Sequence, residues 1–334
     1  MMKKISILFL IIFASIAANA QNPDAAQLHE NARTFMNQGD YSNAILILNR
    51  LLQNDPKNME LYKDLAVSYY LQKDNAKALE AIKPVLESNE VDDQCFQVAG
   101  SIYKAMNDPD AAEKNYKKGL KKFPNSGLLY NEMGELLMAE HNYASISQWE
   151  KGIEVDPNFS RNYYNAAKFY FPTADKVRGI LYGEIFVNLE PFSNKVPEMK
   201  EMLLEGYKKL FSDADLEQNN KDKNSFIKTY LQVMNKQTGL VTQGINTETL
   251  TMIRTRFILD WNNSQLKFAF QLFDYQRQLL QEGLFDAYNQ WLFGSVQNLP
   301  GFQNWITTHA TEYNAFSNFQ KKQVFRIPAG QYYN

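Results

Sequence analysis

Histidines at helical spacing are the side chains from which a metal site is most often built, and this sequence has few of them. His29 and Glu30 begin a string like that of a zinc-protease helix, but the second histidine, four residues on, is replaced by Arg33. His141 and His309 lie far from it and from each other, so no ligand pair four residues apart is formed. The sequence therefore predicts neither a metal site nor a bound cofactor.

Motifs for covalent catalysis and phosphate binding are also missing. The sequence has no Gly-x-x-x-x-Gly-Lys-Ser/Thr loop and no Gly-x-Ser-x-Gly elbow. Its single cysteine, Cys95, stands beside an aromatic residue at a regularly repeated position, so we interpret it as a buried small residue and not as a nucleophile. Carboxylate pairs are uninformative because any charged helix supplies them. We expect a non-enzymatic protein, with an enzyme left as the alternative.

The composition is that of a folded protein without a nucleic-acid partner. The chain has 334 residues, of which 45% are hydrophobic and 13% aromatic, so a packed core is expected. Its 35 basic residues face 37 acidic residues. Because polyanion-binding proteins carry an excess of positive charge, the balance argues against nucleic acid.

The first twenty residues predict export. Lys3 and Lys4 precede an apolar run from Ile5 to Ala18, and small residues follow at the expected cleavage site after Ala20. We expect residues 1–20 to be a cleaved signal peptide and the mature protein to be periplasmic or extracellular, with an uncleaved anchor as the alternative. Gln21 stands where a lipoprotein needs cysteine, so no lipid anchor is predicted, and no later stretch is long enough to span a membrane.

The elements that position the candidate side chains recur with a period of about 34 residues. Small residues recur at spacings of 34, 34, 33 and 34, namely Ala44, Ala78, Ala112, Ser145 and Gly179. Small residues also recur at Ala32, Ala66, Gly100, Gly134 and Ala167, each preceded four residues earlier by a large one. Close crossings between paired helices admit only small side chains, so the pattern predicts helical hairpins.

These positions resemble the tetratricopeptide repeat family. The string Gly39-Asp40-Tyr41-Ser42-Asn43-Ala44, with a later Asp55-Pro56, is similar to the turn, second helix and closing proline of that family. The resemblance covers an array within residues 21–193, with repeats at about 25–58, 59–92, 93–126, 127–159 and 160–193. The string Leu272 to Leu280 further resembles exported repeat proteins of Bacteroidota.

The resemblance implies an all-α, helical-hairpin solenoid with a concave groove. Hairpins of this kind stack because none can bury its apolar face alone. Beyond the array we expect a capping helix at 194–211, a loop or hinge at 212–224, and an aromatic-rich helical region at 225–334 that includes a degenerate sixth repeat. Eighteen aromatic residues lie between Phe257 and Asn334. Their helical spacing favours a core, with an exposed aromatic patch as the alternative.

The family's groove-facing positions are the second, fifth, ninth and twelfth of each first helix. Carried over to this sequence, they give five cations and two anions, which is a reversal of sign in an acidic chain. From them we predict a partner-binding groove formed by His29, Arg33, Lys63, Tyr70, Lys104, Asn131, Arg161, Tyr164, Lys168 and Phe171. The alternative is that these charges are merely solvated helix faces.

The resemblance implies a non-enzymatic scaffold that binds a protein segment, one with acidic residues given the cations of the groove. Chaperone-binding members hold a C-terminal carboxylate through Lys, Asn and Arg at fixed positions, and the matching residues here do not conserve that clamp, as at Asp64 and Val98. A different class, a glycan-binding protein like the starch-utilisation outer-membrane proteins, is the second hypothesis. It is weakened by the missing lipid-attachment cysteine.

Overall fold

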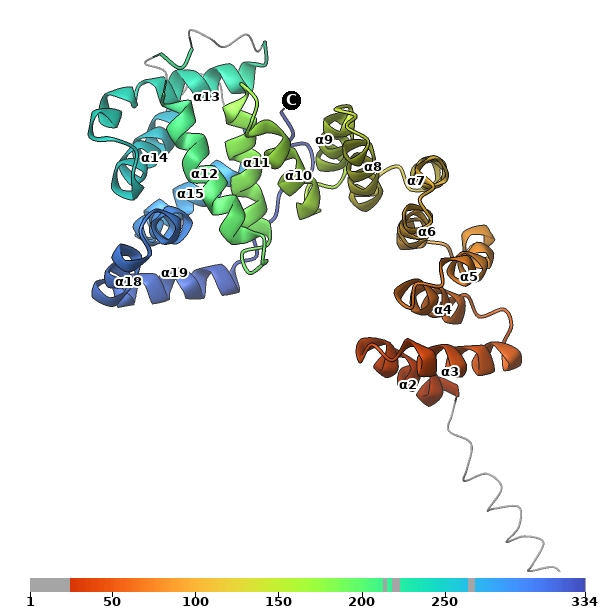
Figure 1. Ribbon diagram of the computed structural model, residues 1–334. Coiled ribbons are helices and arrows are strands. Elements are labelled where there is room, and N and C mark those ends of the chain that lie inside the picture. Colours follow the sequence, from red (N-terminus) through yellow and green to blue (C-terminus); the bar gives the residue numbers. More distant parts are fainter. Residues whose placement is uncertain (1–24, 213–214, 218–222, 264–267, 334) are drawn as a thin grey trace, which may run out of the picture. The chain divides into compact units, whose positions relative to one another are not determined.

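The chain folds as a succession of helices. The computed structural model describes residues 25–212, 215–217, 223–263 and 268–333, and every regular element within these ranges is helical (Figure 1). The predicted all-α fold of consecutive helical hairpins is confirmed. The expected signal peptide lies outside the described residues.

Five hairpins follow one another along the first part of the chain. They are α2 (Ala25–Asn37) with α3 (Tyr41–Asn54), α4 (Met59–Leu71) with α5 (Asn75–Glu87), α6 (Asp93–Ala105) with α7 (Pro109–Lys122), α8 (Gly127–Ala139) with α9 (Ser145–Val155), and α10 (Ser160–Tyr170) with α11 (Lys176–Leu189). Their first helices begin at the residues where the sequence repeats begin.

The turn inside each of the first four hairpins contains one residue in the left-handed conformation. These residues are spaced by 34 and have φ angles between 56° and 79°, at Gly39, Lys73, Asn107 and His141. Glycine adopts this conformation without strain, whereas the other three residues accept a small cost to close the turn. The position of His141 is thereby explained by turn geometry.

Close helix crossings account for the repeated small residues. A Cβ atom added to Gly100 would lie 2.2 Å from the ring of Tyr116, and one added to Gly134 would lie 2.4 Å from Nε1 of Trp149. Both rings are buried and have no room to withdraw. The prediction that Gly100 sits at a close crossing is confirmed.

The helices group into two compact units, one ending at Phe123 and the other beginning at Pro124. The repeat register predicts a boundary after residue 193 instead. The C-terminal helices bond to the fifth hairpin through α11, and the fourth hairpin belongs to unit 2 through the contacts of α8 and α9 with α10.

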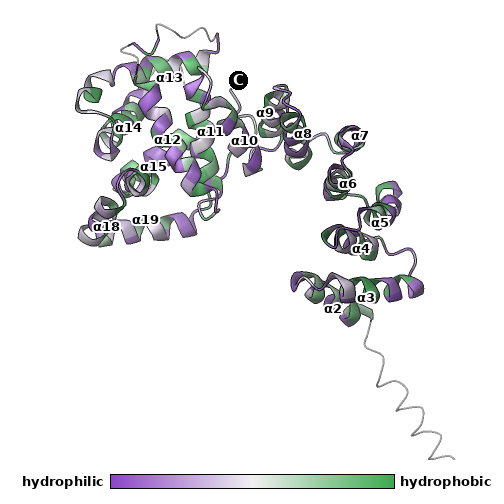
Figure 2. Cartoon of the chain, in the orientation of Figure 1, coloured by the Kyte–Doolittle hydropathy of each residue, from purple (hydrophilic) through white to green (hydrophobic). Residues whose placement is uncertain are grey.

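Helix α11 is buried around its whole circumference. Every residue from Val177 to Asn188 is buried, and hydrophobic colour runs along this helix in Figure 2, whereas α7 is largely hydrophilic. A helix that is apolar on all sides must be enclosed by protein. Helix α12 (Val196–Leu210), the predicted capping helix, packs on α11, with Met199 and Leu203 against Gly183.

The remaining helices enclose α11 and α12 from the other side. They are α13 (Ser225–Asn235), the 3-10 helix η1 (Thr238–Gln243), α14 (Thr247–Asn262), α15 (Gln271–Gln281), α16 (Phe285–Asn289), the π-helix η2 (Gln290–Gly294), α17 (Ser295–Gln297), α18 (Leu299–Thr308) and α19 (Ala310–Lys322). Helices α15 and α16 are joined at Gly283, which has a φ of +69°. Helices α18 and α19 are separated at His309. The expected loop at 212–224 lies partly outside the described residues.

Most of the C-terminal aromatic side chains are core residues. Phe257, Phe273, Tyr288 and Phe316 are each at most 4% exposed. Helix α18 differs, since none of its residues is buried. The core interpretation therefore holds for most of these aromatic residues, and α18 is the exception.

One buried carboxylate joins four helices of unit 2. Glu184 on α11 forms an ion pair with Arg254 on α14, and both side chains are at most 2% exposed. The same oxygen of Glu184 accepts hydrogen bonds from Gln276 Nε2 on α15, at 2.6 Å, and from the Tyr288 hydroxyl on α16, at 2.8 Å. Arg254 also donates to Asn289 on α16. A buried ion pair with additional hydrogen bonds is the arrangement that can offset desolvation.

We predict that replacing one member of this pair strongly destabilises unit 2. Glu184→Gln leaves the Arg254 guanidinium buried without its counter-charge, which should cost about 3–5 kcal/mol in the free energy of unfolding. Arg254→Met should cost a similar amount, whereas the double variant should cost clearly less than the sum. Urea unfolding of the four proteins gives these values.

The matched control is an exposed pair in the same unit. Lys208 and Glu205 on α12 form an ion pair with both side chains more than 40% exposed. Glu205→Gln should change stability by less than about 1 kcal/mol. Equal losses for Glu184→Gln and Glu205→Gln would contradict the importance of the buried pair.

Candidate functional site

The predicted groove residues of unit 1 are engaged by carboxylates of the next repeat. His29 Nε2 lies 2.7 Å from Asp64 Oδ2, and Arg33 Nε donates to the same oxygen at 2.9 Å. Arg33 also reaches Glu60 at 3.1 Å. The contacts join α2 to α4, so these side chains link one repeat to the next.

Lys63 is engaged in the same way. Its ammonium lies 2.7 Å from Asp92 Oδ2, at the N-cap of α6, and this hydrogen bond raises the pKa of Lys63. Lys104 lies over the ring of Tyr116, with Nζ 5.8 Å from the ring centre, and Tyr70 is half-buried. The predicted excess of positive charge is therefore largely neutralised within unit 1.

The anions responsible were missed because they lie outside the four positions counted. Asp64 is the sixth residue of its first helix and Asp92 is an N-cap. The repeat register could have revealed both of these anions. Side chains three or four residues apart on a helix are neighbours, so the count should have included residues beyond the four positions.

An open cleft lies next to these ion pairs at the start of α4. Its volume is about 440 Å³, and it is lined by Asp55, Lys57, Asn58, Met59, Glu60, Lys63 and Glu90. Three acidic and two basic side chains line it. The cleft suits polar groups of mixed charge and offers no excess of positive charge.

In unit 2 the first helices are joined by a polar row. Asn165 on α10 donates to Asn131 Oδ1 on α8 at 2.8 Å, and Asn131 donates to Glu135 at 3.0 Å. Asn131 is fully buried, so it connects helices and presents nothing to a partner. The prediction of Asn131 as a contact residue is corrected for that reason.

A second cluster joins α10 to α12. The Tyr164 hydroxyl donates to Glu198 Oε2 at 2.6 Å, and the Lys168 ammonium lies 2.7 Å from Glu198 Oε1. The hydrogen bond from Lys168 lowers the pKa of Glu198. Lys195 lies over the ring of Tyr164, with Nζ 4.3 Å from its centre. Glu198 lies beyond the five counted repeats but 34 residues after Tyr164, so extending the repeat register by one period could have indicated it.

Burial decides which of the remaining predicted residues reach the surface. Tyr164 is 7% exposed and packs on Phe186, with ring centres 5.1 Å apart. Phe171 is 6% exposed and lies against Gly206, so its prediction as a contact residue is also corrected. Arg161 is exposed and makes no ion pair with another described residue.

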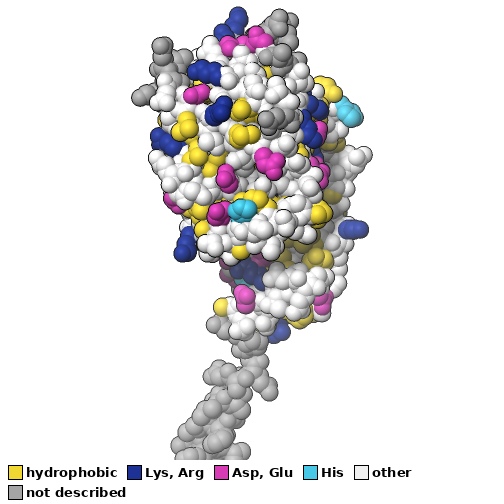
Figure 3. All heavy atoms as spheres, turned by 90° about the vertical axis from the view of Figure 1, so that its left-hand side faces the viewer, with side chains coloured by type: hydrophobic (Ala, Val, Ile, Leu, Met, Phe, Trp, Pro, Cys, Tyr) yellow, Lys and Arg dark blue, Asp and Glu magenta, His cyan; other side chains and the backbone are white. Residues whose placement is uncertain are grey.

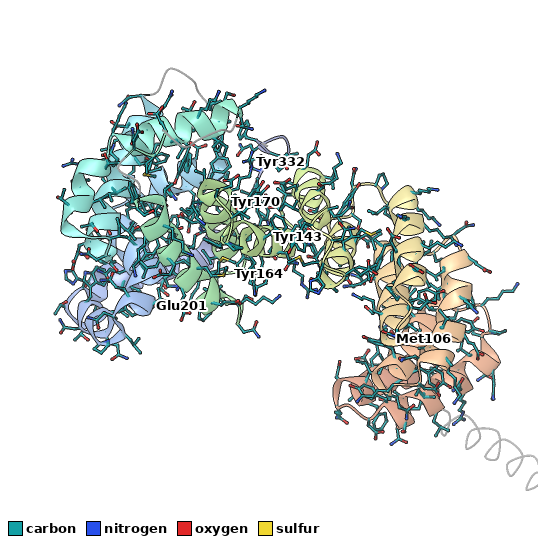
Figure 4. The ribbon with its side chains drawn as sticks, turned by 45° about the horizontal axis from the view of Figure 1, so that its top comes forward. Met106, Tyr143, Tyr164, Tyr170, Glu201 and Tyr332 are labelled. Carbon is teal, nitrogen blue, oxygen red and sulfur yellow. The ribbon has the colours of Figure 1, made fainter. Side chains whose placement is uncertain are left out.

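We call the exposed residues on this side of unit 2 the α10–α12 face; its members are Arg161, Lys168, Lys195, Glu198 and Glu201. Figure 4 shows Tyr164 and Glu201 from α10 and α12, apart from Tyr332 near the C-terminus. Charges of both signs are interspersed over the side seen in Figure 3.

The thiol of Cys95 is not activated. Burial raises the pKa of Cys95 to about 11, and its sulfur lies 2.9 Å from Asp92 Oδ1, so the thiol stays protonated at neutral pH. No group of three or more metal-binding side chains occurs within the described ranges. Among the described helices, none combines the length and apolar character needed to cross a bilayer.

Lys200 on α12 is a buried amine. It is 7% exposed, and its Nζ lies 3.7 Å from the ring centre of Trp291 in the π-helix η2. Burial lowers its pKa to about 7. An amine with such a pKa can act as a base or nucleophile when substrate reaches it, but here the indole ring covers it. We interpret it as a destabilising core residue.

Comparisons with known proteins identify the repeats. The family model described as anaphase-promoting complex, cyclosome, subunit 3 matches residues 37–119. The human tetratricopeptide repeat protein 21B is 26% identical over 127 residues, which is 37% of this chain and 10% of that protein. The chain thus spans about a tenth of the length of this relative. Both comparisons support the resemblance of these repeats to tetratricopeptide repeats.

Solved structures with similar folds include several repeat proteins. MamA shares 19% identity at a TM-score of 0.40, covering 48% of this chain and 94% of that one. PilF of Pseudomonas aeruginosa shares 15% identity at a TM-score of 0.48, with coverages of 57% and 86%. YrrB, described as a TPR protein with an unusual peptide-binding site, shares 16% identity at a TM-score of 0.38, with coverages of 58% and 97%.

The buried amine of Lys200 gives a pH-dependent prediction. Its pKa is about 7 in the folded protein and 10.5 in the unfolded chain, so the unfolded chain binds more protons between these values. Stability should therefore rise as the pH increases from about 7 to 10.5, and the full cost applies below pH 7. Lys200→Met should raise the free energy of unfolding at pH 7 by on the order of 2 kcal/mol.

This gain should shrink as the pH approaches 10.5, which urea unfolding at several pH values would measure. Lys228→Met, at an exposed position of α13, is the control and should give a difference that does not vary with pH. A Lys200→Met protein less stable than the wild type at pH 7 would show that the contact with Trp291 outweighs desolvation.

Proposed function

We propose that this tetratricopeptide-repeat protein is an exported, non-enzymatic scaffold that binds a segment of another protein on the α10–α12 face. The observation that carries the proposal is the contrast between the two sides of the last hairpin. Helix α11 is buried from Val177 to Asn188, whereas Arg161 on α10, Lys195 at the N-cap of α12 and Glu201 on α12 remain exposed. A helical-repeat surface left open in this way is suited to protein binding.

The exposed charges of this face define the partner. Lys168 and Glu198 neutralise each other and are each less than half exposed. Arg161 makes no ion pair with another described residue. Lys195 lies over the Tyr164 ring, and its charge also helps to lower the pKa of Glu198. A partner segment with acidic residues would complement these two cations, and such complementarity mainly accelerates association and sets register.

The corresponding side chains of unit 1 are weaker candidates. Arg33 and Lys63 already contact Asp64 and Asp92, so binding an acidic segment there would require breaking those ion pairs. The described clefts give no specific support to the glycan-binding alternative.

Site-specific crosslinking in cells tests the proposed face. A photo-crosslinking residue in place of Glu201 should capture a specific protein, identified by mass spectrometry. Arg161→Glu combined with Lys195→Glu should reduce that capture by about tenfold, because both cations then repel an acidic segment. The reduction should be smaller at high salt, where charges about 8 Å or more apart are screened.

The control places the same crosslinker at Lys151, an exposed position of α9 in the same unit. Capture of the same protein with equal yield from positions 151 and 201, unaffected by the charge reversals, would refute the proposed face. Circular dichroism of the purified variants checks that the fold is retained.

We further propose export with cleavage after Ala20, since the first twenty residues have the order of a signal peptide. Expression of the full-length sequence in a bacterial host should give a mature protein whose N-terminal sequencing begins at Gln21. Retention of Met1 or Met2 in the purified protein would contradict this prediction.

A further inference from the structure

The segment from Val324 to Tyr333 lies on unit 2 as an extended peptide. It follows α19 and has no helical structure, and in Figure 1 it passes from the end of α19 along the fifth hairpin. Its side chains alternate in exposure, with Phe325 and Ile327 at most 4% exposed and Val324 64% exposed. Alternate side chains entering pockets are typical of a bound extended peptide. We call this segment the tail.

A single side chain recognises the backbone of the tail. The side-chain amide of Asn158, in the loop between α9 and α10, donates from Nδ2 to the Ile327 carbonyl at 3.0 Å. The Ile327 amide donates in turn to Asn158 Oδ1 at 2.9 Å. One asparagine thereby satisfies both backbone groups of one residue, as a neighbouring β-strand would, and this recognition is independent of side-chain identity.

The apolar anchors supply sequence preference on either side of Asn158. Phe325 packs edge-on against Tyr275, with ring centres 5.1 Å apart. Ile327 lies in the core of unit 2. At the other end, Tyr333 stacks on Phe226 with ring centres 4.8 Å apart, and its hydroxyl donates to the Ala269 carbonyl at 2.9 Å.

The cleft under the tail is formed by helices and is not completely filled. It is lined by α9, α10, α11 and α13, and an empty space of about 20 Å³ remains where these helices meet residues 331–333 of the tail. An occupant with slightly different side chains would therefore fit the same cleft.

We propose that this cleft is a peptide-binding site, that the tail is its resident occupant, and that it also accepts an extended partner segment with the tail's own pattern. That pattern is an aromatic residue, any residue, a branched aliphatic residue and proline, as in Phe325-Arg326-Ile327-Pro328. The cleft shares no residue with the α10–α12 face, so the proposal stands independently of the function proposed above.

The linkage to α19 explains why the tail is bound in the isolated protein. Only Gln323 separates the end of α19 from the tail, and a short linker gives an effective concentration in the millimolar range. A partner segment must compete with that concentration, so binding in trans is weak until the tail is released. The site is thus closed by the tail and opened by loss of its anchors.

The test uses the full chain and a fluorescent peptide with the sequence of residues 323–333. Wild-type protein should bind this probe weakly. Phe325→Ala with Ile327→Ala removes both anchors but leaves the cleft intact, and this variant should bind the probe at least about tenfold more tightly. Adding Asn158→Ala should remove most of that gain, and a probe with aspartate at the Ile327 position should not bind.

Two outcomes would overturn the proposal. One is a folded double variant that binds the probe no better than the wild type. The other comes from hydrogen exchange on the wild-type protein, which needs no variant: the Ile327 amide should exchange through local opening, faster than amides within α11. Exchange of both only by global unfolding would make the tail a permanent part of the core. If the wild-type protein dimerises by exchanging tails, the occupant of the cleft is a second copy of this chain. That result would rule out the proposed partner segment.

Discussion

The carboxylate of Glu184 is the interaction on which unit 2 depends. It lies at the centre of α11, accepts hydrogen bonds from α14, α15 and α16, and has no access to water. Such a group cannot remain in the core without its donors, because a buried and unpaired charge is very costly. The C-terminal helices are therefore held to α11 by a specific network as well as by apolar contact. A second helix of a repeat, which usually meets solvent on its outer side, has become the centre of a larger domain.

This enclosure determines which surfaces remain for a partner. Because α13 to α16 cover α11, the fifth repeat keeps only its first-helix side open. On that side many polar groups already bond to the next repeat, as Lys168 does to Glu198 and Asn165 to Asn131. These bonds hold successive hairpins in register. The charge available for recognition is accordingly smaller than a count of cations suggests, and it lies with Arg161 and Lys195.

The tail shows that unit 2 can hold an extended peptide. Asn158 reads its backbone, and two apolar residues enter the core beside it. The α10–α12 face and the tail cleft differ in chemistry. The first offers exposed charge and suits rapid, salt-sensitive association, whereas the second offers buried apolar pockets and suits slow dissociation. A scaffold with both would engage partners on two sides of α10.

The sequence by itself determined the repeats. A small residue at a close crossing has no substitute, and Ala44, Ala78 and Ala112 recur at a spacing of 34 residues. It also indicated the helices of the C-terminal region and the burial of most aromatic residues there. The tertiary structure alone decided the domain grouping, since Glu184 and Arg254 lie 70 residues apart and neither belongs to a local pattern. It likewise decided the charge of the predicted groove, because Asp64, Asp92 and Glu198 neutralise cations from neighbouring elements. The repeat period reflects the residue types required on the faces of each helix. Which side chains pair between different elements depends on how the folded chain arranges those elements.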